Sequence, residues 1–388
     1  MLKIQTLNNI SVKGLERFPL DRYEIASEIL HPDAVLLRSF KMHDIDIPVS
    51  VKAVGRAGAG VNNIPVKAMS DRGIVVFNTP GANANAVKEL VIAGMLLAAR
   101  NICQAWDYAR HVEGDDASIN KQVEEQKKNY VGFELPGRTL GVIGLGAIGI
   151  RVANAAISLG MKVIGFDPQI TVQGAWKLSA DVQQARSVDD LLASSDMVSL
   201  HVPLVDATKN MINAERLQAM KDNVVILNFS REGIIDDAAV SAQIKAGKVY
   251  AYVCDFPTNL LKNHERVITL PHIGASTEEA EENCAMMVVD QVRDFLENGN
   301  IHNSVNFPEV DMPRIKGTYR IAIANSNVPN MVGQISTTMA QSGLNISDMI
   351  NKSQGALAYT MADVESEIPQ VVIDKIAAIK GVLSVRVL

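Results

Sequence analysis

The sequence predicts an α/β protein with two doubly wound parallel-sheet (Rossmann-like) domains and a smaller C-terminal ferredoxin-like domain of βαββαβ order. Three observations support this fold class. The chain has 388 residues, which exceeds the size at which one hydrophobic core usually keeps growing. Short apolar runs alternate with helix-length segments over most of the chain, as in parallel sheets whose strands are joined by helices. From residue 315 onward the order of the predicted elements changes.

The first domain is predicted from short apolar runs that are separated by polar or glycine-containing segments. An apolar helix without interior proline follows at residues 87–100, and we place a domain boundary near residue 100. We assign residues 1–99 and residues 276–305 to this domain. Its three predicted strands are residues 34–37, 51–54 and 74–77.

The second domain, residues 100–275, repeats the alternation of apolar strands with helix-length intervals. This pattern is typical of a doubly wound sheet. Its four clearest strands are residues 139–143, 162–166, 197–200 and 224–227.

The third domain, residues 315–388, follows a polar segment with two prolines. Its pattern predicts strand, helix, two strands, helix and strand, which is the order of a ferredoxin-like sandwich. These elements are residues 319–324, 331–342, 345–351, 357–364, 370–380 and 382–388.

The composition excludes several classes of protein. With 47% hydrophobic and 21% charged residues, the chain can build a large core and is not expected to be disordered. The formal net charge of -6 provides no basic surface for nucleic acid or for an anionic membrane. No apolar stretch is long enough to cross a bilayer and the N-terminus lacks a leader pattern, so a cytoplasmic location is expected. Cys103, Cys254 and Cys284 are widely spaced, which predicts neither a disulfide framework nor a zinc site.

The sharpest motif is the Gly-Leu-Gly-Ala-Ile-Gly segment that directly follows a predicted strand and opens a helix. In a Rossmann turn of this kind, Gly144 permits the tight turn, Gly146 lets the backbone approach a pyrophosphate, and Gly149 allows the helix to pack closely on the sheet. The helix N-terminus, at Ala147 and Ile148, presents backbone N–H groups to phosphate. We therefore expect a dinucleotide site here.

An acidic residue, Asp167, stands at the end of the next predicted strand. A carboxylate at this place accepts hydrogen bonds from the adenosine ribose hydroxyls and repels a 2'-phosphate. Neither Pro168 nor Gln169 offers a cation for that phosphate. The predicted cofactor is therefore NAD rather than NADP.

Beyond this motif, the chain resembles the D-isomer-specific 2-hydroxyacid dehydrogenases over essentially its whole length, in particular members with a C-terminal ACT domain. The resemblance implies a first domain that binds substrate and carries out catalysis, a second domain that binds NAD, and a regulatory third domain. It rests on residues 55–63, 78–83, 144–149, 201–204, 228–231, 255–257 and 271–277.

The catalytic residues implied by the resemblance fit the chemistry of oxidising a 2-hydroxy acid. A base must take the hydroxyl proton while a hydride leaves C2, and histidine titrates in the right range. His272, in the segment Pro-His-Ile-Gly-Ala-Ser, is the candidate base. The substrate carboxylate requires a planar fork of donors that stays protonated, and Arg231 matches the family's arginine. The mechanism requires no metal.

Two positions depart from the family pattern. The family pairs its histidine with an acid that raises the imidazole pKa and fixes the tautomer. Asn259 stands about where that acid is expected, so the third catalytic member is open, and Glu265 in the next segment is a candidate substitute. Glu232 follows Arg231 directly where the family usually has glycine, which adds a carboxylate beside a cationic site.

The resemblance also implies the residues that line the two ligands. The glycine-rich loop after Arg56 is expected to offer backbone N–H groups as an anion nest for the substrate. The remaining implied cofactor contacts are Thr79, His201, Val202, Pro203, Phe229, Ser230, Asp255, Gly274 and Ala275. The implied substrate contacts are Arg38, Ser39, Arg56, Ala57, Gly58 and Asn83.

The third domain resembles an ACT domain, a small-ligand module that in this family binds L-serine and pairs across subunits. Asn325, Asn327 and Asn345 match the polar positions that hold the amino acid. Asn330 replaces the family's glycine in the turn, and Asn is the commonest non-glycine residue at positive φ.

The resulting expectation is an NAD-dependent oxidation of 3-phospho-D-glycerate to 3-phosphohydroxypyruvate, the first step of L-serine biosynthesis, by a homodimer or homotetramer. Two alternatives stay open. One is a D-2-hydroxyacid dehydrogenase that acts on an unphosphorylated substrate. The other is a non-catalytic NAD-sensing protein on the same fold, which Asn259 and Glu232 suggest.

Overall fold

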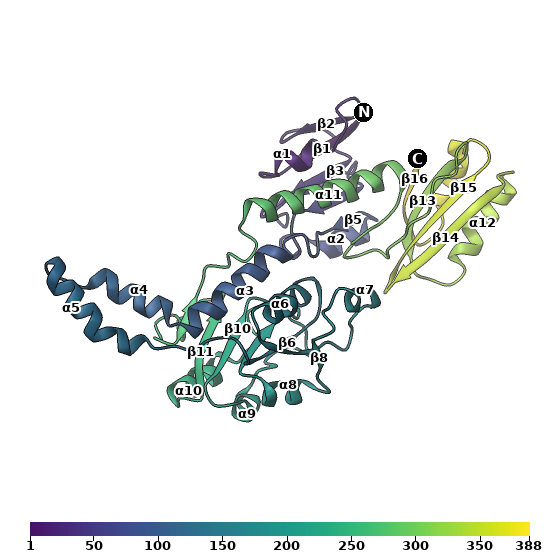
Figure 1. The fold of residues 1–388 in the computed structure, drawn as a ribbon. Coiled ribbons are helices and arrows are strands. Elements are labelled where there is room, and N and C mark those ends of the chain that lie inside the picture. The colour runs from purple at the N-terminus through teal and green to yellow at the C-terminus, as the bar shows by residue number, and fades with distance from the viewer. The chain divides into compact units, whose positions relative to one another are not determined.

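The computed structural model describes all 388 residues, which form two compact units. The first unit contains Met1–Ala82 and Glu278–Leu388, and the second contains Asn83–Thr277. Figure 1 follows the chain through both units by colour. No helix is both long enough and apolar enough to cross a membrane.

The N-terminal part of the first unit is a five-stranded parallel sheet of order β2-β1-β3-β4-β5. The sequence predicted three of these strands and missed the first two, which are only partly buried. The strands are β1 (Leu2–Thr6), β2 (Tyr23–Ala26), β3 (Ala34–Leu37), β4 (Ala53–Arg56) and β5 (Val75–Phe77).

Three helices flank this sheet: α1 (Val12–Leu15), α2 (Val66–Asp71) and the long α11 (Glu278–Asn298). Apolar side chains recur on α11 every three or four residues, so one stripe of the helix faces the core. Val288 and Val292 from this stripe approach Gly55 of β4 so closely that a Cβ there would collide with them. The return of α11 to the N-terminal sheet explains why residues distant in sequence share one core.

The second unit contains a seven-stranded parallel sheet of order β12-β11-β10-β9-β6-β7-β8, which is the Rossmann order with one added edge strand. Apolar clusters cover both faces of the sheet, as in a doubly wound fold. The strands are β6 (Thr139–Ile143), β7 (Lys162–Phe166), β8 (Gln183–Gln184), β9 (Met197–Leu200), β10 (Val224–Asn228), β11 (Val249–Cys254) and β12 (Val267–Thr269).

The helices of the second unit include one that the sequence analysis placed elsewhere. Helix α3 (Ala84–Ala99) packs on α6, β10 and β11, because Val87, Val91, Met95 and Ala98 join the apolar cluster on that face. The compact units therefore divide at Ala82 rather than near residue 100. The helices that follow the first glycine turn are α6 (Ala147–Ser158), α7 (Val172–Ala175), α8 (Val188–Ser194), α9 (Ala214–Ala219) and α10 (Asp237–Lys245).

A helical hairpin extends from the rest of the second unit (Figure 1). It consists of α4 (Ile102–His111), α5 (Asp116–Gln126) and a 3-10 turn at Lys127–Tyr130, and neither α4 nor α5 has a buried residue. Helix α5 begins where the Asp115 carboxylate accepts a hydrogen bond from the Ser118 N–H.

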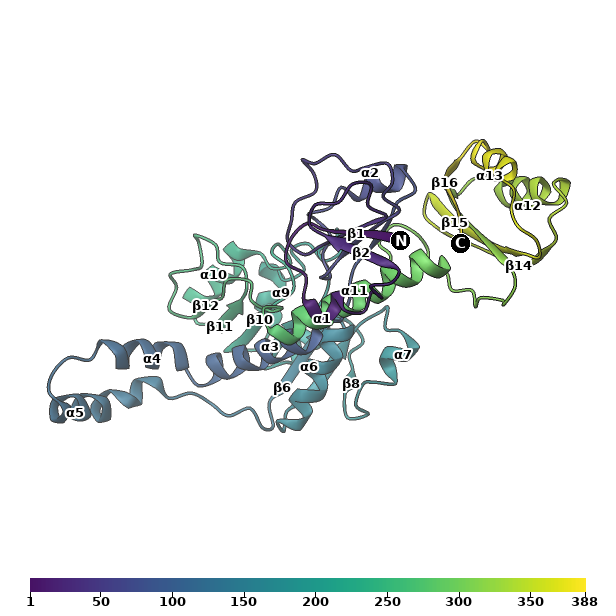
Figure 2. The same ribbon diagram turned by 90° about the horizontal axis from the view of Figure 1, so that it is seen from above.

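The C-terminal part of the first unit has the predicted βαββαβ order and an antiparallel sheet of order β14-β15-β13-β16. Figure 2 shows its two helices together on one face of this sheet. The opposite face contributes Ala322, Ala324, Tyr359 and Met361 to the core shared with α11. The elements are β13 (Tyr319–Ser326), α12 (Met331–Gln341), β14 (Ile346–Gln354), β15 (Leu357–Val364), α13 (Gln370–Ala377) and β16 (Val382–Val387).

A fully buried ion pair anchors the C-terminal sheet to the segment that precedes it. Arg320 donates Nε to one carboxylate oxygen of Asp363 at 2.6 Å and Nη2 to the other at 2.8 Å. The same guanidinium also donates to the carbonyl oxygens of Asn298, Met312 and Pro313. Such a saturated guanidinium fixes a junction geometrically, because losing either partner would leave a buried charge unpaired.

Candidate active site

The glycine turn after β6 has three glycines with three different surroundings. Gly144 has φ +91°, and a Cβ there would lie 2.4 Å from the carbonyl oxygen of His201. A Cβ on Gly149 would lie 1.9 Å from the carbonyl oxygen of Gly144, so the turn and helix are in direct contact. A Cβ on Gly146 meets nothing within 4 Å. The open side of the turn is therefore at Gly146, next to the N-terminus of the twelve-residue helix α6, where anions are favoured.

Asp167 follows β7 and lies beside this turn. One carboxylate oxygen accepts a hydrogen bond from the Leu145 N–H at 2.8 Å, and the other accepts one from the Gln169 N–H at 2.8 Å. These contacts fix the carboxylate on the glycine turn. Each oxygen keeps a further acceptor site, which suits the ribose hydroxyls of a dinucleotide.

His201 follows β9 and forms a wall behind the turn. Its backbone N–H donates to the Ile143 carbonyl oxygen at 2.7 Å, and its Nε2 is 2.8 Å from the Ser199 hydroxyl. Burial lowers the pKa of His201 to about 4. The imidazole is therefore neutral near neutral pH, which does not suit a group that takes up a proton from substrate.

Asp255 follows β11 and is almost fully buried. Its Oδ1 has no hydrogen-bond partner within the protein, whereas the Gly274 N–H donates to the carboxylate. Burial raises the pKa of Asp255, and the charge of His272 and the Gly274 hydrogen bond oppose that shift. A buried acceptor without a protein partner is expected where a ligand supplies the donor.

His272 lies in an exposed loop with φ +52°, a left-handed conformation that is uncommon for a residue other than glycine. Its ring packs edge-to-face on Phe256, with centroids 5.2 Å apart and planes at 72°. Asn259 and Glu265 are exposed, and neither forms a hydrogen bond or ion pair with His272. The structure thus brings Phe256 and the charge of Asp255 to the imidazole instead of either residue proposed as its acidic partner.

Arg231 follows β10 with an exposed side chain. Its Nη1 donates to the Ser230 carbonyl oxygen at 2.6 Å, and the Asn228 side chain donates to the Arg231 carbonyl oxygen at 3.0 Å. The Ser230 hydroxyl in turn donates to the carbonyl oxygen of Leu200. Asn228 belongs to the segment 228–231 that carries the resemblance but was assigned no role of its own, although a polar residue at the end of an apolar strand is a signal that the sequence contains.

The remaining predicted cofactor residues have diverse surroundings. Val202 lies near Gly144, Phe229 is buried in the core near Gly94, and Pro203 is exposed. Gly274 is buried, and a Cβ there would lie 3.3 Å from the Asp255 carboxylate. Ala275 is partly buried in the same loop as His272.

The predicted substrate loop lies in the first unit and is held by its own arginine. Arg56 donates Nε to the Arg38 carbonyl oxygen at 3.0 Å and Nη1 to the carbonyl oxygen of Gly60. The Ala57 N–H donates to Leu37 and the Gly58 N–H donates to Arg56. These two amide groups are already used within the protein, so an anion nest in this loop would have to come from its other N–H groups.

Other contacts place the neighbours of this loop. The Arg38 guanidinium pairs with Glu281 at 2.7 Å, and the Thr79 N–H donates to the Gly58 carbonyl oxygen. Asn8 accepts from the Arg38 N–H and donates to the Ser39 hydroxyl, a role that the sequence analysis missed. Asn83 stands at the N-cap position of α3 in the second unit, but its side chain forms no capping hydrogen bond.

The three asparagines predicted to hold an effector differ in exposure. Asn325 is fully buried, donates to the Ser326 carbonyl oxygen and accepts from Thr360, so its amide is not presented to a ligand. Asn327 is exposed and donates to the Gly355 carbonyl oxygen, and Asn345 is exposed before β14. Asn330 takes φ +65°, so the turn keeps its left-handed residue without glycine.

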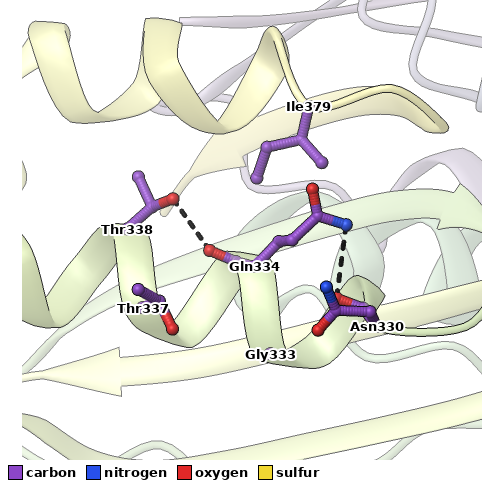
Figure 3. Close-up of a pocket in the computed structure, with 6 residues that line it drawn as sticks. All are labelled: Asn330, Gly333, Gln334, Thr337, Thr338 and Ile379. Atoms are coloured by element: carbon purple, nitrogen blue, oxygen red, sulfur yellow. Dashed lines mark hydrogen bonds between the residues drawn. The ribbon is translucent and has the colours of Figure 1, made fainter.

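A shallow hollow of about 320 Å³ adjoins this turn at the start of α12. Figure 3 shows the Gln334 side chain bent toward Asn330, whose carbonyl oxygen it reaches at 3.3 Å, and the Thr338 hydroxyl bonded to the Gln334 carbonyl oxygen. The polar groups that line the hollow are thus partly satisfied by the helix itself.

Comparisons with known proteins agree on one family. Residues 92–274 match the D-isomer specific 2-hydroxyacid dehydrogenase, NAD binding domain. The chain is 37% identical over 320 residues to a D-3-phosphoglycerate dehydrogenase of Archaeoglobus fulgidus, covering 79% of this chain but only 58% of that relative. It is 33% identical to the D-3-phosphoglycerate dehydrogenase of Haemophilus influenzae, with 87% of this chain and 81% of the relative covered.

Among solved structures, the NAD-bound 3-phosphoglycerate dehydrogenase of Entamoeba histolytica is similar at TM-score 0.60 and 28% identity. The match covers 79% of this chain and 98% of that one.

Proposed function

Because the chain belongs to the D-isomer-specific 2-hydroxyacid dehydrogenase family, we propose that it is an NAD-dependent oxidoreductase that converts 3-phospho-D-glycerate to 3-phosphohydroxypyruvate, the first step of L-serine biosynthesis. The observation that carries this proposal is the edge of the second sheet, where the open glycine turn, Asp167, Arg231 and Asp255 all follow parallel strands. Ligands of doubly wound sheets bind beyond the carboxyl ends of the strands. The substrate is inferred from the relatives' names.

The residues present suit NAD, which supplies the acceptor for a hydride from C2 of the substrate. Its pyrophosphate fits the space beside Gly146 at the N-terminus of α6, and its adenosine ribose fits Asp167. The unpartnered Oδ1 of Asp255 is suited to the amide N–H of the nicotinamide. His201, neutral and fixed by Ser199, contributes a wall without charge.

His272 and Arg231 are the proposed catalytic residues. His272 takes the proton of the C2 hydroxyl in the oxidation and returns a proton in the reduction. Arg231 binds the substrate carboxylate, which stays ionised throughout, with a guanidinium positioned by Ser230 and Asn228. Phe256 positions the imidazole by ring packing, and the buried Asp255 places a negative charge near it.

Arg38 and Arg56 are the proposed substrate contacts in the first unit. Arg56 keeps its fork on the carbonyl oxygens of the loop and so holds the loop in shape. Arg38 is paired with Glu281, and a doubly charged phosphate would compete with that single carboxylate.

The C-terminal βαββαβ domain is the proposed ACT module, with L-serine as effector and with assembly into a homodimer or homotetramer. Asn327 and Asn345 are the candidate effector contacts, since both are exposed. The left-handed Asn330 supports this proposal because it preserves the turn between β13 and α12.

A non-catalytic NAD sensor is the second candidate, because no acidic side chain pairs with His272 by a hydrogen bond. One experiment separates the candidates: initial rates of NADH oxidation with 3-phosphohydroxypyruvate, with hydroxypyruvate and with other 2-oxo acids. The proposal expects kcat/KM to be at least about tenfold higher for the phosphorylated substrate. A preference for an unphosphorylated acid would refute the substrate, and tight NADH binding without turnover on any acid would favour the sensor.

A further inference from the structure

A second pocket, unrelated to the dinucleotide turn, lies within the first unit where β16 meets the end of α11 and the N-terminal sheet. Its volume is about 380 Å³. It is lined by Leu2, Lys52, Leu296, Glu297, Val385, Arg386, Val387 and Leu388. Charged groups of both signs thus share the pocket with an apolar wall.

Arg386 supplies a cation with an unmet donor. Its Nη2 donates to the carbonyl oxygens of Phe295 at 3.0 Å and Leu296 at 3.1 Å, and its Cζ lies 4.2 Å over the Phe295 ring. Its Nη1 is buried and has no hydrogen-bond acceptor. A buried cationic N–H without an acceptor is costly, and an anionic oxygen is the partner that best removes this cost.

Lys52 adds a second positive charge. Its Nζ pairs with Asp33 at 2.6 Å, which occupies one of the three N–H donors of the ammonium group. Lys52 and Arg386 both line the pocket, so a carboxylate bound there lies beside two positively charged side chains.

Glu297 supplies the opposite charge at the same pocket. Its Oε1 accepts hydrogen bonds from the Tyr23 hydroxyl at 2.9 Å and from Arg293 Nε at 3.1 Å. Arg22 Nη2 lies 3.4 Å from the same oxygen. All three contacts go to Oε1, so Oε2 takes no part in them. The carboxylate is held in place while one oxygen keeps its acceptor capacity, which suits an ammonium group.

The remaining lining residues indicate what kind of side chain the ligand has. The side chains of Leu2, Leu296, Val385 and Leu388 are aliphatic and offer no hydrogen bond to a hydroxyl or phosphate. A phosphate or a dicarboxylate would also lie close to the negative charge of Glu297. We propose that this pocket binds an α-amino acid with an aliphatic side chain, its carboxylate on Arg386 and Lys52 and its ammonium group on Glu297.

The pocket joins the C-terminal sheet to the N-terminal sheet, so occupation should strengthen that junction. The ring of Phe295, under Arg386, packs edge-to-face on Phe77 with the ring centroids 5.5 Å apart. Its centroid lies 6.4 Å from that of Tyr359 in β15. Phe77 ends β5 two residues before Thr79. A bound ligand would therefore raise the melting temperature of the full chain by mass action, whether or not the chain is a dehydrogenase.

The test is isothermal titration of the full chain with L-leucine and with two analogues that each lack one charge, 4-methylpentanoate and 3-methylbutylamine. We expect one L-leucine per chain and binding at least about tenfold weaker for each analogue. L-serine, which lacks the aliphatic side chain, should compete poorly. Absence of binding and of thermal stabilisation by L-leucine, L-valine and L-isoleucine would overturn the proposal, as would equal affinity for L-leucine and 4-methylpentanoate.

Two variants and one control locate the site. Glu297→Gln should lower the preference for L-leucine over 4-methylpentanoate toward one, a ratio that a general loss of stability would not change. Lys52→Met should weaken the binding of L-leucine and of 4-methylpentanoate, which both carry a carboxylate, while the binding of 3-methylbutylamine stays the same. Lys67→Met is the control, because Lys67 also forms a surface ion pair, with Asp71 at 3.1 Å, outside the pocket. Unchanged selectivity in Glu297→Gln, or equal losses in Lys67→Met, would contradict the assignment.

Discussion

Two glycine-rich loops follow parallel strands in this chain, and they serve opposite purposes. The loop after β6 leaves open space beside Gly146 at the N-terminus of α6. The loop after β4 is filled by the protein itself, because Arg56 folds back onto the carbonyl oxygen of Gly60 and a Cβ on Gly58 would lie 2.8 Å from its Nη1.

The difference shows that glycine content alone does not define an anion site. In the first loop the glycines make room for a ligand, and the helix that follows supplies N–H groups. In the second loop the glycines make room for a side chain, and the Ala57 and Gly58 N–H groups are already bonded. A larger residue in the first loop should therefore leave the fold intact but weaken ligand binding. A larger residue in the second loop should disturb the conformation of the loop itself.

The largest effect is expected at His272, the proposed catalytic histidine. His272→Ala should lower kcat on the order of 10³-fold, because removing the general acid–base leaves no group to exchange the substrate proton. Steady-state NADH oxidation measures kcat, and fluorescence titration should show unchanged NADH affinity. His43→Ala, at an exposed histidine, is the control. Full activity in His272→Ala would remove this residue from the mechanism.

The second prediction contrasts the two loops directly. Gly146→Val should weaken NADH binding about 100-fold with little change in melting temperature, because the added side chain enters the ligand space and its Cβ meets no protein atom within 4 Å. Gly58→Val should do the reverse, lowering the melting temperature and sparing NADH affinity, because its Cβ meets the Arg56 guanidinium. Titration and thermal unfolding of both variants test this contrast. Equal effects of the two substitutions would show that the two loops do not differ in this way.

The third prediction concerns the wall behind the open loop. The pKa of His201 is lowered by burial from 6.5 to about 4, so the unfolded chain binds more protons than the folded chain between these values. Stability contributed by the neutral imidazole is complete above pH 6.5 and is lost as the pH falls toward 4. In the wild type, the free energy of unfolding should fall as the pH drops from 6.5 toward 4. His201→Gln should make this fall smaller by about 2 kcal/mol, as measured by urea unfolding. An unchanged pH dependence, equal to that of His43→Gln, would argue against a buried neutral His201.

The smallest effect is expected for a conservative change in the filled loop. Arg56→Lys should raise KM about tenfold with little change in kcat, because lysine cannot donate to the carbonyl oxygens of both Arg38 and Gly60 in one planar fork. Initial rates at varied substrate give the separation. A fall in kcat without a change in KM would indicate that Arg56 acts on the transition state instead.

Much of the fold could be predicted because its signals are local. The apolar runs of the second sheet and the glycine turn lie within short segments, and their periods are distinctive. Strands β1 and β2 were missed because their faces are only partly buried. The boundary near residue 100 differed from the structure because helix pattern alone cannot tell which sheet an apolar face packs on, and Val91 and Met95 face the second one.

For the candidate site, the sequence indicated residues but not the contacts that position them. The packing of Phe256 on His272 joins a strand end to a loop sixteen residues further along the chain. The support of Arg38 and Ser39 by Asn8 likewise joins two distant segments. Such pairings depend on where separate elements meet, which no local pattern encodes.

Hydride transfer can be observed in a single turnover: the full chain is saturated with NADH, mixed with 3-phosphohydroxypyruvate, and followed by the absorbance of the reduced nicotinamide. We expect rapid loss of that absorbance in the unmodified chain and none on the same timescale in His272→Ala, which still binds NADH. Persistent absorbance in the unmodified chain, with NADH bound, would contradict the dehydrogenase assignment.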